Sequence, residues 1–179
     1  KGLVPAPCTQ TCPSHVDAAR YIRLIAEGKP DEAVAVIREK IPFPAVCGYI
    51  CAHPCETACT RGQIDEPIAI RMLKRFAVDN DSGLWKKRSK IASPSGKRVA
   101  IIGSGPAGLT AAYYLAKLSG HSVTIFEALP LPGGMMLVGI PKYRLPRNIL
   151  DADIKEIENV GVKIKTNTRI DSPQSLLEE

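Results

Sequence analysis

The sequence predicts two domains, a helical and cysteine-containing domain over residues 1–80 and a parallel α/β unit over residues 98–179, joined by a linker over residues 81–97. Three observations support this division. Apolar residues recur at helical spacing in the first part of the chain, and all six cysteines lie there. From Arg98 onward, strand-like and helix-like segments alternate around a glycine-rich turn. The predicted fold class is therefore an α-helical domain followed by a βαβ unit.

The composition is that of a soluble globular protein, with 45% apolar and 23% charged residues. The net charge of +6 is mild, and much of the excess lies between Lys86 and Lys97. The sequence shows no basic face with interleaved aromatic residues, which nucleic-acid binding would favour. No apolar run approaches the length of a membrane span. We therefore expect no nucleic-acid partner and no membrane partner.

Three helices are expected in the first domain. The first covers about residues 15–27, and the second covers about residues 31–40, with Pro30 in its first turn. The third runs from Pro67 to about Asn80, and its inward residues are expected to be Ile70, Leu73, Phe76 and Ala77. Few of these side chains are large, so the core looks thin. Small domains of this kind are often stabilised by a metal centre.

The linker contains the only tryptophan of the chain, Trp85, among glycine, serine, proline and basic residues. An indole ring carries a large apolar surface, so a tryptophan in a polar linker usually docks on a neighbouring surface. We expect such docking for Trp85, and stacking on a cofactor is the alternative.

The chain then follows the pattern of a dinucleotide-binding βαβ unit. A strand-like run, Val99–Ile102, leads into the glycine turn Gly103–Gly108, and a helix is expected over Leu109–Leu118. A second strand, Ser122–Phe126, ends at an acid, Glu127. A lone glycine fingerprint is weak, but here the strand, the helix and the acid all stand at the required places. The alternative is an ordinary glycine turn.

The residues of this turn have separate physical roles in holding a dinucleotide. Gly103 permits the tight turn, Gly105 lets a pyrophosphate approach the backbone, and Gly108 lets the helix pack close to the strand. The free N–H groups at the helix N-terminus favour the phosphate charge. Glu127 would accept hydrogen bonds from the adenosine ribose hydroxyls.

Further elements are expected after this unit. The pair Gly133-Gly134 precedes residues 140–146, which hold too many prolines for a helix. A helix over about residues 147–159 and a third strand over residues 162–165 complete the predicted order of elements.

The cysteines admit three interpretations. Two lie near the start of the chain and four recur at intervals of four residues; they are Cys8, Cys12, Cys47, Cys51, Cys55 and Cys59. Disulfides need an oxidising compartment, which nothing in the sequence indicates. Structural zinc sites favour paired hooks separated by longer loops. Iron–sulfur clusters also need clustered cysteines, and the spacing alone leaves these interpretations open.

The order of these features resembles the small (β) subunit of NADPH-dependent glutamate synthase, the N-terminal module of dihydropyrimidine dehydrogenase, and the large subunit of the NADH-dependent ferredoxin:NADP oxidoreductases. The residues that carry the resemblance are Cys8–Pro13, Val46–Cys51, Cys55, Cys59, Pro67–Ile70, Lys74–Phe76, Gly133–Gly134, Gly139–Pro141 and Arg144–Pro146. The resemblance implies an α-helical iron–sulfur domain followed by an α/β Rossmann-like, FAD-binding βαβ unit that is incomplete at its C-terminus. We therefore expect a fragment of a longer polypeptide that is not active alone.

The resemblance also implies a cytoplasmic, NAD(P)H-dependent FAD and iron–sulfur oxidoreductase. This chain would be an electron-transfer module between NAD(P)H, FAD and [4Fe–4S], serving a larger redox partner subunit or domain. No catalytic side chain is implied, and the implied FAD-binding residues are Gly103, Gly105, Pro106, Ala107, Gly108, Glu127, Gly134, Met135 and Arg144. NAD(P)H would bind a part of the protein not present in this chain. The alternatives are a non-catalytic, cluster-bearing docking domain of a larger redox complex and a zinc-stabilised piece of an NAD-binding dehydrogenase.

The resemblance further implies how the thiolates are shared. In the family pattern, Cys12, Cys51 and Cys55 serve one cluster. Cys8 and Cys59 serve another cluster, which two further cysteines complete.

This sequence departs from the family pattern at two positions. Leu3 stands where one of the further cysteines is expected, and Lys74 stands where many relatives place Glu or Gln as a fourth ligand. A protonated lysine has no lone pair to offer a metal. We therefore expect one [4Fe–4S] cluster, with two as the alternative. Cys47 is either a further ligand or a buried structural thiol.

Overall fold

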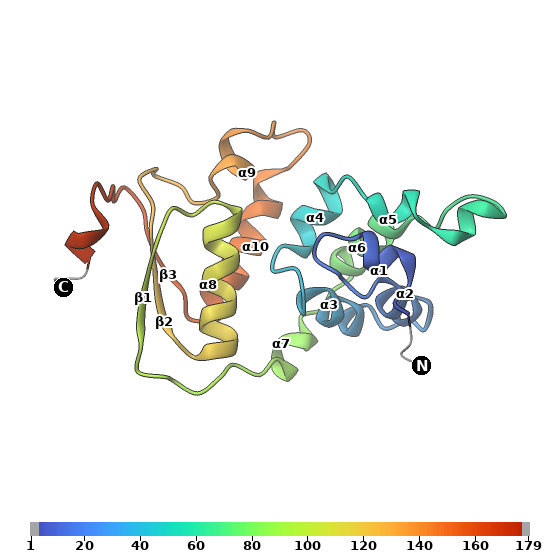
Figure 1. The fold of residues 1–179 in the computed structure, drawn as a ribbon, viewed down its shortest axis with the longest axis horizontal. Coiled ribbons are helices and arrows are strands. Elements are labelled where there is room, and N and C mark those ends of the chain that lie inside the picture. Colours follow the sequence, from blue (N-terminus) through green and yellow to red (C-terminus); the bar gives the residue numbers. More distant parts are fainter. Residues whose placement is uncertain (1–3, 177–179) are drawn as a thin grey trace. The chain divides into compact units, whose positions relative to one another are not determined.

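The computed structural model describes residues 4–176, so the departure at Leu3 lies outside the described residues. The described chain divides into two compact units, which are coloured blue to green and green to red in Figure 1. The boundary falls between Ser89 and Lys90, within the segment predicted as a linker.

The first unit is helical. Proline occupies the first turn of four of its helices, where its fixed φ suits the helix and its missing N–H would have no intrahelical partner. The helices predicted near residues 15–27 and 31–40 are present as α2 and α3, and Asp17 caps α2 by accepting from the Arg20 N–H at 3.0 Å. In chain order, the elements are α1 (Pro7–Thr11), α2 (Ala18–Ala26), α3 (Pro30–Arg38), α4 (Pro44–Ile50), α5 (Pro54–Thr57), the 3-10 helix η1 (Thr60–Gln63), α6 (Ile70–Asp79) and α7 (Leu84–Arg88).

The core of this unit forms where α2, α3 and α4 pack against α6. Its fully buried side chains include one aromatic ring, and otherwise they are aliphatic and mostly of moderate size: Tyr21, Ala33, Val34, Ile37, Val46, Ile70 and Ala77. The Tyr21 hydroxyl donates to the Ile70 carbonyl oxygen at 3.1 Å, which ties α2 to the first turn of α6.

Helix α6 buries only part of the predicted face: Ile70 and Ala77 are buried as predicted, whereas Leu73 is half-buried. It begins at Ile70 rather than Pro67. Phe76 is 51% exposed, so the prediction that it points inward is wrong, while Lys74 is only 6% exposed. The buried positions are Ile70, Lys74 and Ala77, which share one face because they are four and three residues apart. A basic side chain therefore lies on the buried face of this helix.

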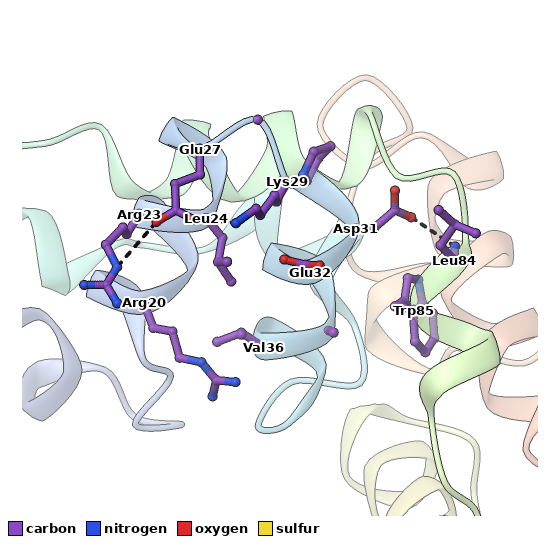
Figure 2. Close-up of a pocket in the computed structure, with 13 residues that line it drawn as sticks. Arg20, Arg23, Leu24, Glu27, Lys29, Asp31, Glu32, Val36, Leu84 and Trp85 are labelled. Atoms are coloured by element: carbon purple, nitrogen blue, oxygen red, sulfur yellow. Dashed lines mark hydrogen bonds and ion pairs between the residues drawn. The ribbon is translucent and has the colours of Figure 1, made fainter.

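The predicted docking of Trp85 is confirmed. It lies on α7, within the predicted linker, and its Nε1–H donates to Asp81 at 2.7 Å. The Arg38 guanidinium of α3 lies 4.6 Å from the ring centroid, a distance at which a cation–π contact is favourable. Figure 2 shows the neighbouring link, in which Asp31 of α3 accepts from the Leu84 N–H at 3.0 Å. The beginning of the segment predicted as a linker is thus fastened to α3.

The second unit is a parallel sheet in the order β1-β2-β3. Helix α8 packs against β1 and β2, and α10 packs against α8. All three predicted strands and both long helices are present within a few residues of their predicted bounds. The elements are β1 (Arg98–Ile102), α8 (Pro106–Ser119), β2 (Ser122–Phe126), α9 (Met135–Val138), α10 (Arg147–Asn159), β3 (Lys163–Lys165) and the 3-10 helix η2 (Pro173–Leu176).

In the described residues, β1 is an edge strand, because only β2 pairs with it. Its last residue, Ile102, is 52% exposed. A hollow of about 680 Å³ is lined by side chains of all three strands together with Pro173 and Leu176. Across residues 4–176, none of the helices combines the length and apolar character needed to cross a bilayer.

Candidate cofactor sites

The glycine turn of the second unit connects β1 to α8. Gly103 has a φ of +91°, which favours glycine, and its N–H donates to the Phe126 carbonyl oxygen at 2.8 Å. Gly105 is the N-cap of α8 and has an ordinary φ of −71°. A Cβ at Gly105 would have no neighbour within 4 Å, whereas a Cβ at Gly108 would overlap the Gly103 carbonyl oxygen. Gly108 is thus required by packing, and Gly105 borders open space.

The N-terminus of α8 presents backbone donors to that open space. Pro106 is its first residue, and Ala107 follows. Within the described chain, no side chain caps this end of the helix. Uncapped first-turn N–H groups and the positive end of the helix dipole favour an anion such as a pyrophosphate. The turn therefore fits the phosphate part of a dinucleotide.

Glu127 is held at the end of β2 as a buried carboxylate. It is 6% exposed. Its Oε2 accepts from the Ser104 N–H at 2.8 Å and from the Ser104 hydroxyl, and its Oε1 accepts from the Leu129 N–H at 2.8 Å. Burial alone would raise the pKa of Glu127, but these hydrogen bonds outweigh burial and hold the pKa below its usual value. The side chain is thus an ionised acceptor beside the glycine turn.

Ser104 is the residue of this site that sequence reasoning missed. It is fully buried and belongs to the glycine turn. Besides its two bonds to Glu127, its hydroxyl and its carbonyl oxygen each accept from the Gly133 N–H at 3.1 Å. Ser104 therefore joins the turn, the acid and the Gly133-Gly134 pair. In the fingerprint it occupies an unspecified position, so the motif gave no signal for it.

The other predicted dinucleotide residues are only partly brought together. Gly134 lies against the turn, since a Cβ there would come within 2.7 Å of the Gly105 Cα. Met135 is exposed at the start of α9, and Arg144 is exposed in the proline-containing loop. That loop is held by Arg147, which donates to the carbonyl oxygens of Met136 and Ile140 at 3.2 and 3.1 Å. Sequence reasoning did not identify Arg147.

The cysteines of the first unit lie mainly at the ends of short helices. Cys8 lies in α1, Cys12 and Cys51 follow the C-termini of α1 and α4, and Cys55 lies in α5. Cys47 lies within α4, and Cys59 precedes η1. All six are free thiols of intermediate exposure.

Four of these cysteines act electrostatically on one buried hydroxyl, that of Tyr21. Burial raises the pKa of Tyr21, and the nearby thiolate charges raise it further; they belong to Cys55, Cys12, Cys8 and Cys51. Residues from α1, from the end of α4 and from α5 thus lie within electrostatic range of the same side chain of α2. The thiol of Cys59 has a different environment, in which the backbone of Ile68 is the main cause of a lowered pKa.

The loop between Cys51 and Cys55 is fastened to α6. The Cys51 sulfur accepts from the His53 N–H at 3.3 Å, and the Cys51 carbonyl oxygen accepts from Arg71 at 3.3 Å. Glu56 accepts from the Arg71 N–H at 2.8 Å and lies 3.1 Å from His53 Nδ1. Burial raises the pKa of the Cys55 thiol, and the positive charge of a residue on α6, Lys74, opposes that effect.

The described thiols do not form a site for a single metal ion. Among residues 4–176, no three cysteine, histidine or carboxylate side chains are grouped closely enough to bind one metal ion. Two sulfurs on one zinc lie at most about 4.6 Å apart, because each Zn–S bond is about 2.3 Å. A four-iron cluster is larger, so its thiolates can stand farther apart. The separate cavity of about 520 Å³ between α2, α3 and α7 contains none of the cysteines (Figure 2).

Comparisons with known proteins match both units. Residues 4–84 match the family described as dihydropyrimidine dehydrogenase domain II, 4Fe-4S cluster. Residues 101–139 match the family described as NAD(P)-binding Rossmann-like domain. The chain is a homologue of NAD(P)-dependent oxidoreductase subunits. The predicted resemblance is thereby confirmed, as are a helical iron–sulfur domain and a Rossmann-like unit with a small parallel sheet.

Three relatives illustrate this homology. The β subunit of NADP(+)-dependent formate dehydrogenase from Moorella thermoacetica is 47% identical, over 95% of this chain and 27% of that protein. The β subunit of NADPH-Fe(3+) oxidoreductase from Geobacter sulfurreducens is 47% identical, over 97% of this chain and 26% of that protein. Subunit PreT of NAD-dependent dihydropyrimidine dehydrogenase from Salmonella typhimurium is 41% identical, over 96% and 42%. The chain thus spans less than half the length of each.

Proposed function

We propose that this chain is an electron-transfer module of an NAD(P)H-dependent flavin and iron–sulfur oxidoreductase. The observation that carries the proposal is the match of residues 4–84 to a 4Fe-4S family, and within these residues Cys8, Cys12, Cys51 and Cys55 all act electrostatically on the Tyr21 hydroxyl. The same chain contains a glycine turn with an ionised acid beside it. Its homologues are subunits of NAD(P)-dependent oxidoreductases.

The proposed ligands of one [4Fe–4S] cluster are those four cysteines. The family resemblance assigns Cys12, Cys51 and Cys55 to one cluster and assigns Cys8, with Cys59, to another. We place Cys8 in the first cluster because its charge acts on the same hydroxyl as those of the other three. Cys59 and Cys47 remain the candidates for a second cluster. A bound cluster would supply one-electron transfer, and these residues would hold it at the surface where α1 meets α5.

The proposed ligand of the second unit is FAD. Gly103, Gly105 and Gly108 would hold the pyrophosphate with the first amides of α8, and Glu127 would hold the ribose hydroxyls. A flavin accepts a hydride and releases single electrons, which suits a module that also carries a cluster. The family match describes NAD(P) binding, and FAD and NAD(P) share the adenosine and pyrophosphate groups that this turn recognises.

The remaining parts of the proposal concern the whole protein. The NAD(P)H site would lie outside this chain, and a larger partner subunit or domain would take the electrons, as in the glutamate synthase type of enzyme. We propose a cytoplasmic location. A docking domain with a vestigial flavin site is the weaker candidate, because the glycine turn retains open space at Gly105 and the buried acid Glu127.

The test is an absorption spectrum of anaerobically purified protein, with iron, zinc, sulfide and flavin analysis. Flavin bands together with a broad iron–sulfur shoulder are expected. The shoulder without flavin would support the docking domain instead. Zinc without iron would overturn the electron-transfer function.

A further inference from the structure

Lys74 lies on the buried face of α6, in an environment that is unfavourable for a charge. It is 6% exposed, and its neighbours on that face are Ile70 and Ala77, which are 2% and 0% exposed. Transferring an ammonium group from water into a protein interior costs about several kcal/mol of free energy. A nearby negative charge or hydrogen-bond acceptors can compensate this cost.

The described residues offer Lys74 no carboxylate partner. Within residues 4–176, the Lys74 side chain forms neither a hydrogen bond nor an ion pair, its Nζ keeps some contact with solvent, and its positive charge acts on the Cys55 thiol. The nearest other cations of α6 are both engaged. Arg75 stacks on the Tyr49 ring, 4.0 Å from its centroid, and pairs with Asp79 at 3.4 Å. Arg71 donates to the Cys51 carbonyl oxygen.

The position of Lys74 indicates which negative charge it faces. It lies one helical turn after Ile70, whose carbonyl oxygen accepts from the Tyr21 hydroxyl. The charges of four cysteine thiols act on that hydroxyl. Helix α6 also contacts α5, which carries Cys55, and the positive charge of Lys74 acts on the Cys55 thiol. Lys74 therefore lies on the side of α6 that faces Cys55.

We propose that Lys74 compensates the negative charge of a thiolate-bound cluster and thereby raises the reduction potential of that cluster. This inference rests on the proposed function, in which Cys12, Cys51 and Cys55 are ligands. It replaces the ligand role that the family resemblance gives to Glu or Gln at this position. A protonated lysine can donate hydrogen bonds to sulfur but cannot ligate iron.

The positive charge of Lys74 determines in which direction it shifts the reduction potential of the cluster. Reduction adds one electron to the cluster, so a nearby cation stabilises the reduced form more than the oxidised form. Net charge and hydrogen bonds to the sulfurs are among the factors that set cluster potentials. We expect loss of the Lys74 charge to shift the reduction equilibrium at least about tenfold toward the oxidised cluster, which is about 59 mV for one electron.

The experiment compares variants of the anaerobically purified protein by dithionite titration, with the cluster followed by electron paramagnetic resonance. Lys74→Met and Lys74→Gln remove the charge at similar length, and Lys74→Arg keeps it. Arg75→Gln is the matched control, because it removes a charge from the same helix at a partnered position. Iron and sulfide content are measured in every sample.

We expect a lower midpoint potential in the Met and Gln variants, a potential near that of the parent in the Arg variant, and little change in the control. An unchanged potential in the Met and Gln variants would overturn the inference. Equal shifts in the Arg75→Gln control would also overturn it, because the effect would then not be specific to Lys74. Iron loss in the Met, Gln and Arg variants alike would indicate that Lys74 is needed for assembly and would refute the charge role. Absence of any iron–sulfur signal from the parent protein would instead overturn the proposed function.

Discussion

Replacing Ser104 by alanine removes the hydroxyl that joins Glu127 to Gly133. The hydroxyl donates to the Glu127 carboxylate and accepts from the Gly133 N–H. The Gly133 N–H keeps the Ser104 carbonyl oxygen as a second acceptor, so the main loss is one hydrogen bond to a buried charge. Such a bond contributes about 1.5–3 kcal/mol. We expect the free energy of unfolding of the second unit to fall by about that amount at neutral pH.

The pH dependence of this loss has a defined sign. The pKa of Glu127 is lower in the folded protein than its ordinary value, so its contribution to stability is fully present above the unfolded pKa of about 4.3. The contribution is lost as the pH falls through the folded pKa. Because Ser104→Ala weakens the stabilisation of the carboxylate, the stabilities of the variant and the parent should approach each other as the pH falls from about 4.3 and converge only below the folded pKa of Glu127.

The assay is urea denaturation of the parent and of Ser104→Ala between pH 3 and pH 8, followed by a probe in the second unit. Ser119→Ala is the control, because Ser119 is an exposed serine at the end of α8. A variant as stable as the parent at pH 7 would refute the coupling of Ser104 to Glu127. A stability difference that persists unchanged to low pH would show that the loss has another cause.

Three further outcomes are expected. Gly105→Val should abolish flavin binding, because its side chain would occupy the place of the pyrophosphate, and should leave the fold and the iron content intact, because a Cβ there meets nothing within 4 Å. Gly108→Val should instead unfold the second unit, because a Cβ there overlaps the backbone. Retained flavin in the Gly105→Val variant would contradict the assignment. Glu127→Ala should weaken FAD binding by about 1–3 kcal/mol. Titration calorimetry on deflavinated protein measures this difference, and an FAD affinity equal to that of the parent would show that Glu127 does not bind the ribose. Cys55→Ser should lose iron and unfold the helical domain predicted over residues 1–80, with little effect on the βαβ unit, because metal binding and folding are coupled in small domains. Hydrogen exchange, read separately for the two units, tests this expectation. Protection of the helical unit in the absence of metal would refute it.

Sequence reasoning located the elements of the second unit well because glycines and prolines mark their ends. Gly103–Gly108 fixed the junction of β1 and α8, and Pro146 fixed the start of α10. In the first unit, prolines start α1, α4 and α5. Those helices were not predicted, because four to seven residues are too few to show a helical period.

The misjudged features depend on contacts between distant residues. Phe76 is the more apolar residue, and hydrophobic periodicity therefore assigned it to the core in preference to Lys74. Only the packing of α6 against α2, α3 and α4 decides which face is buried. Ser104 is similar, since its partners Glu127 and Gly133 lie 23 and 29 residues away along the chain. No local pattern encodes such bonds.

The edge position of β1 has a consequence for the behaviour of the isolated chain. A parallel strand alternates the direction of its N–H groups, so half of the β1 amides point away from β2. Unpaired strand edges readily accept another strand, including one from a second molecule. In hydrogen exchange, the outward amides of residues 99–102 should exchange rapidly in dilute monomer and slowly once any strand pairs with them. Those few amides would therefore report directly on self-association or on a neighbouring strand.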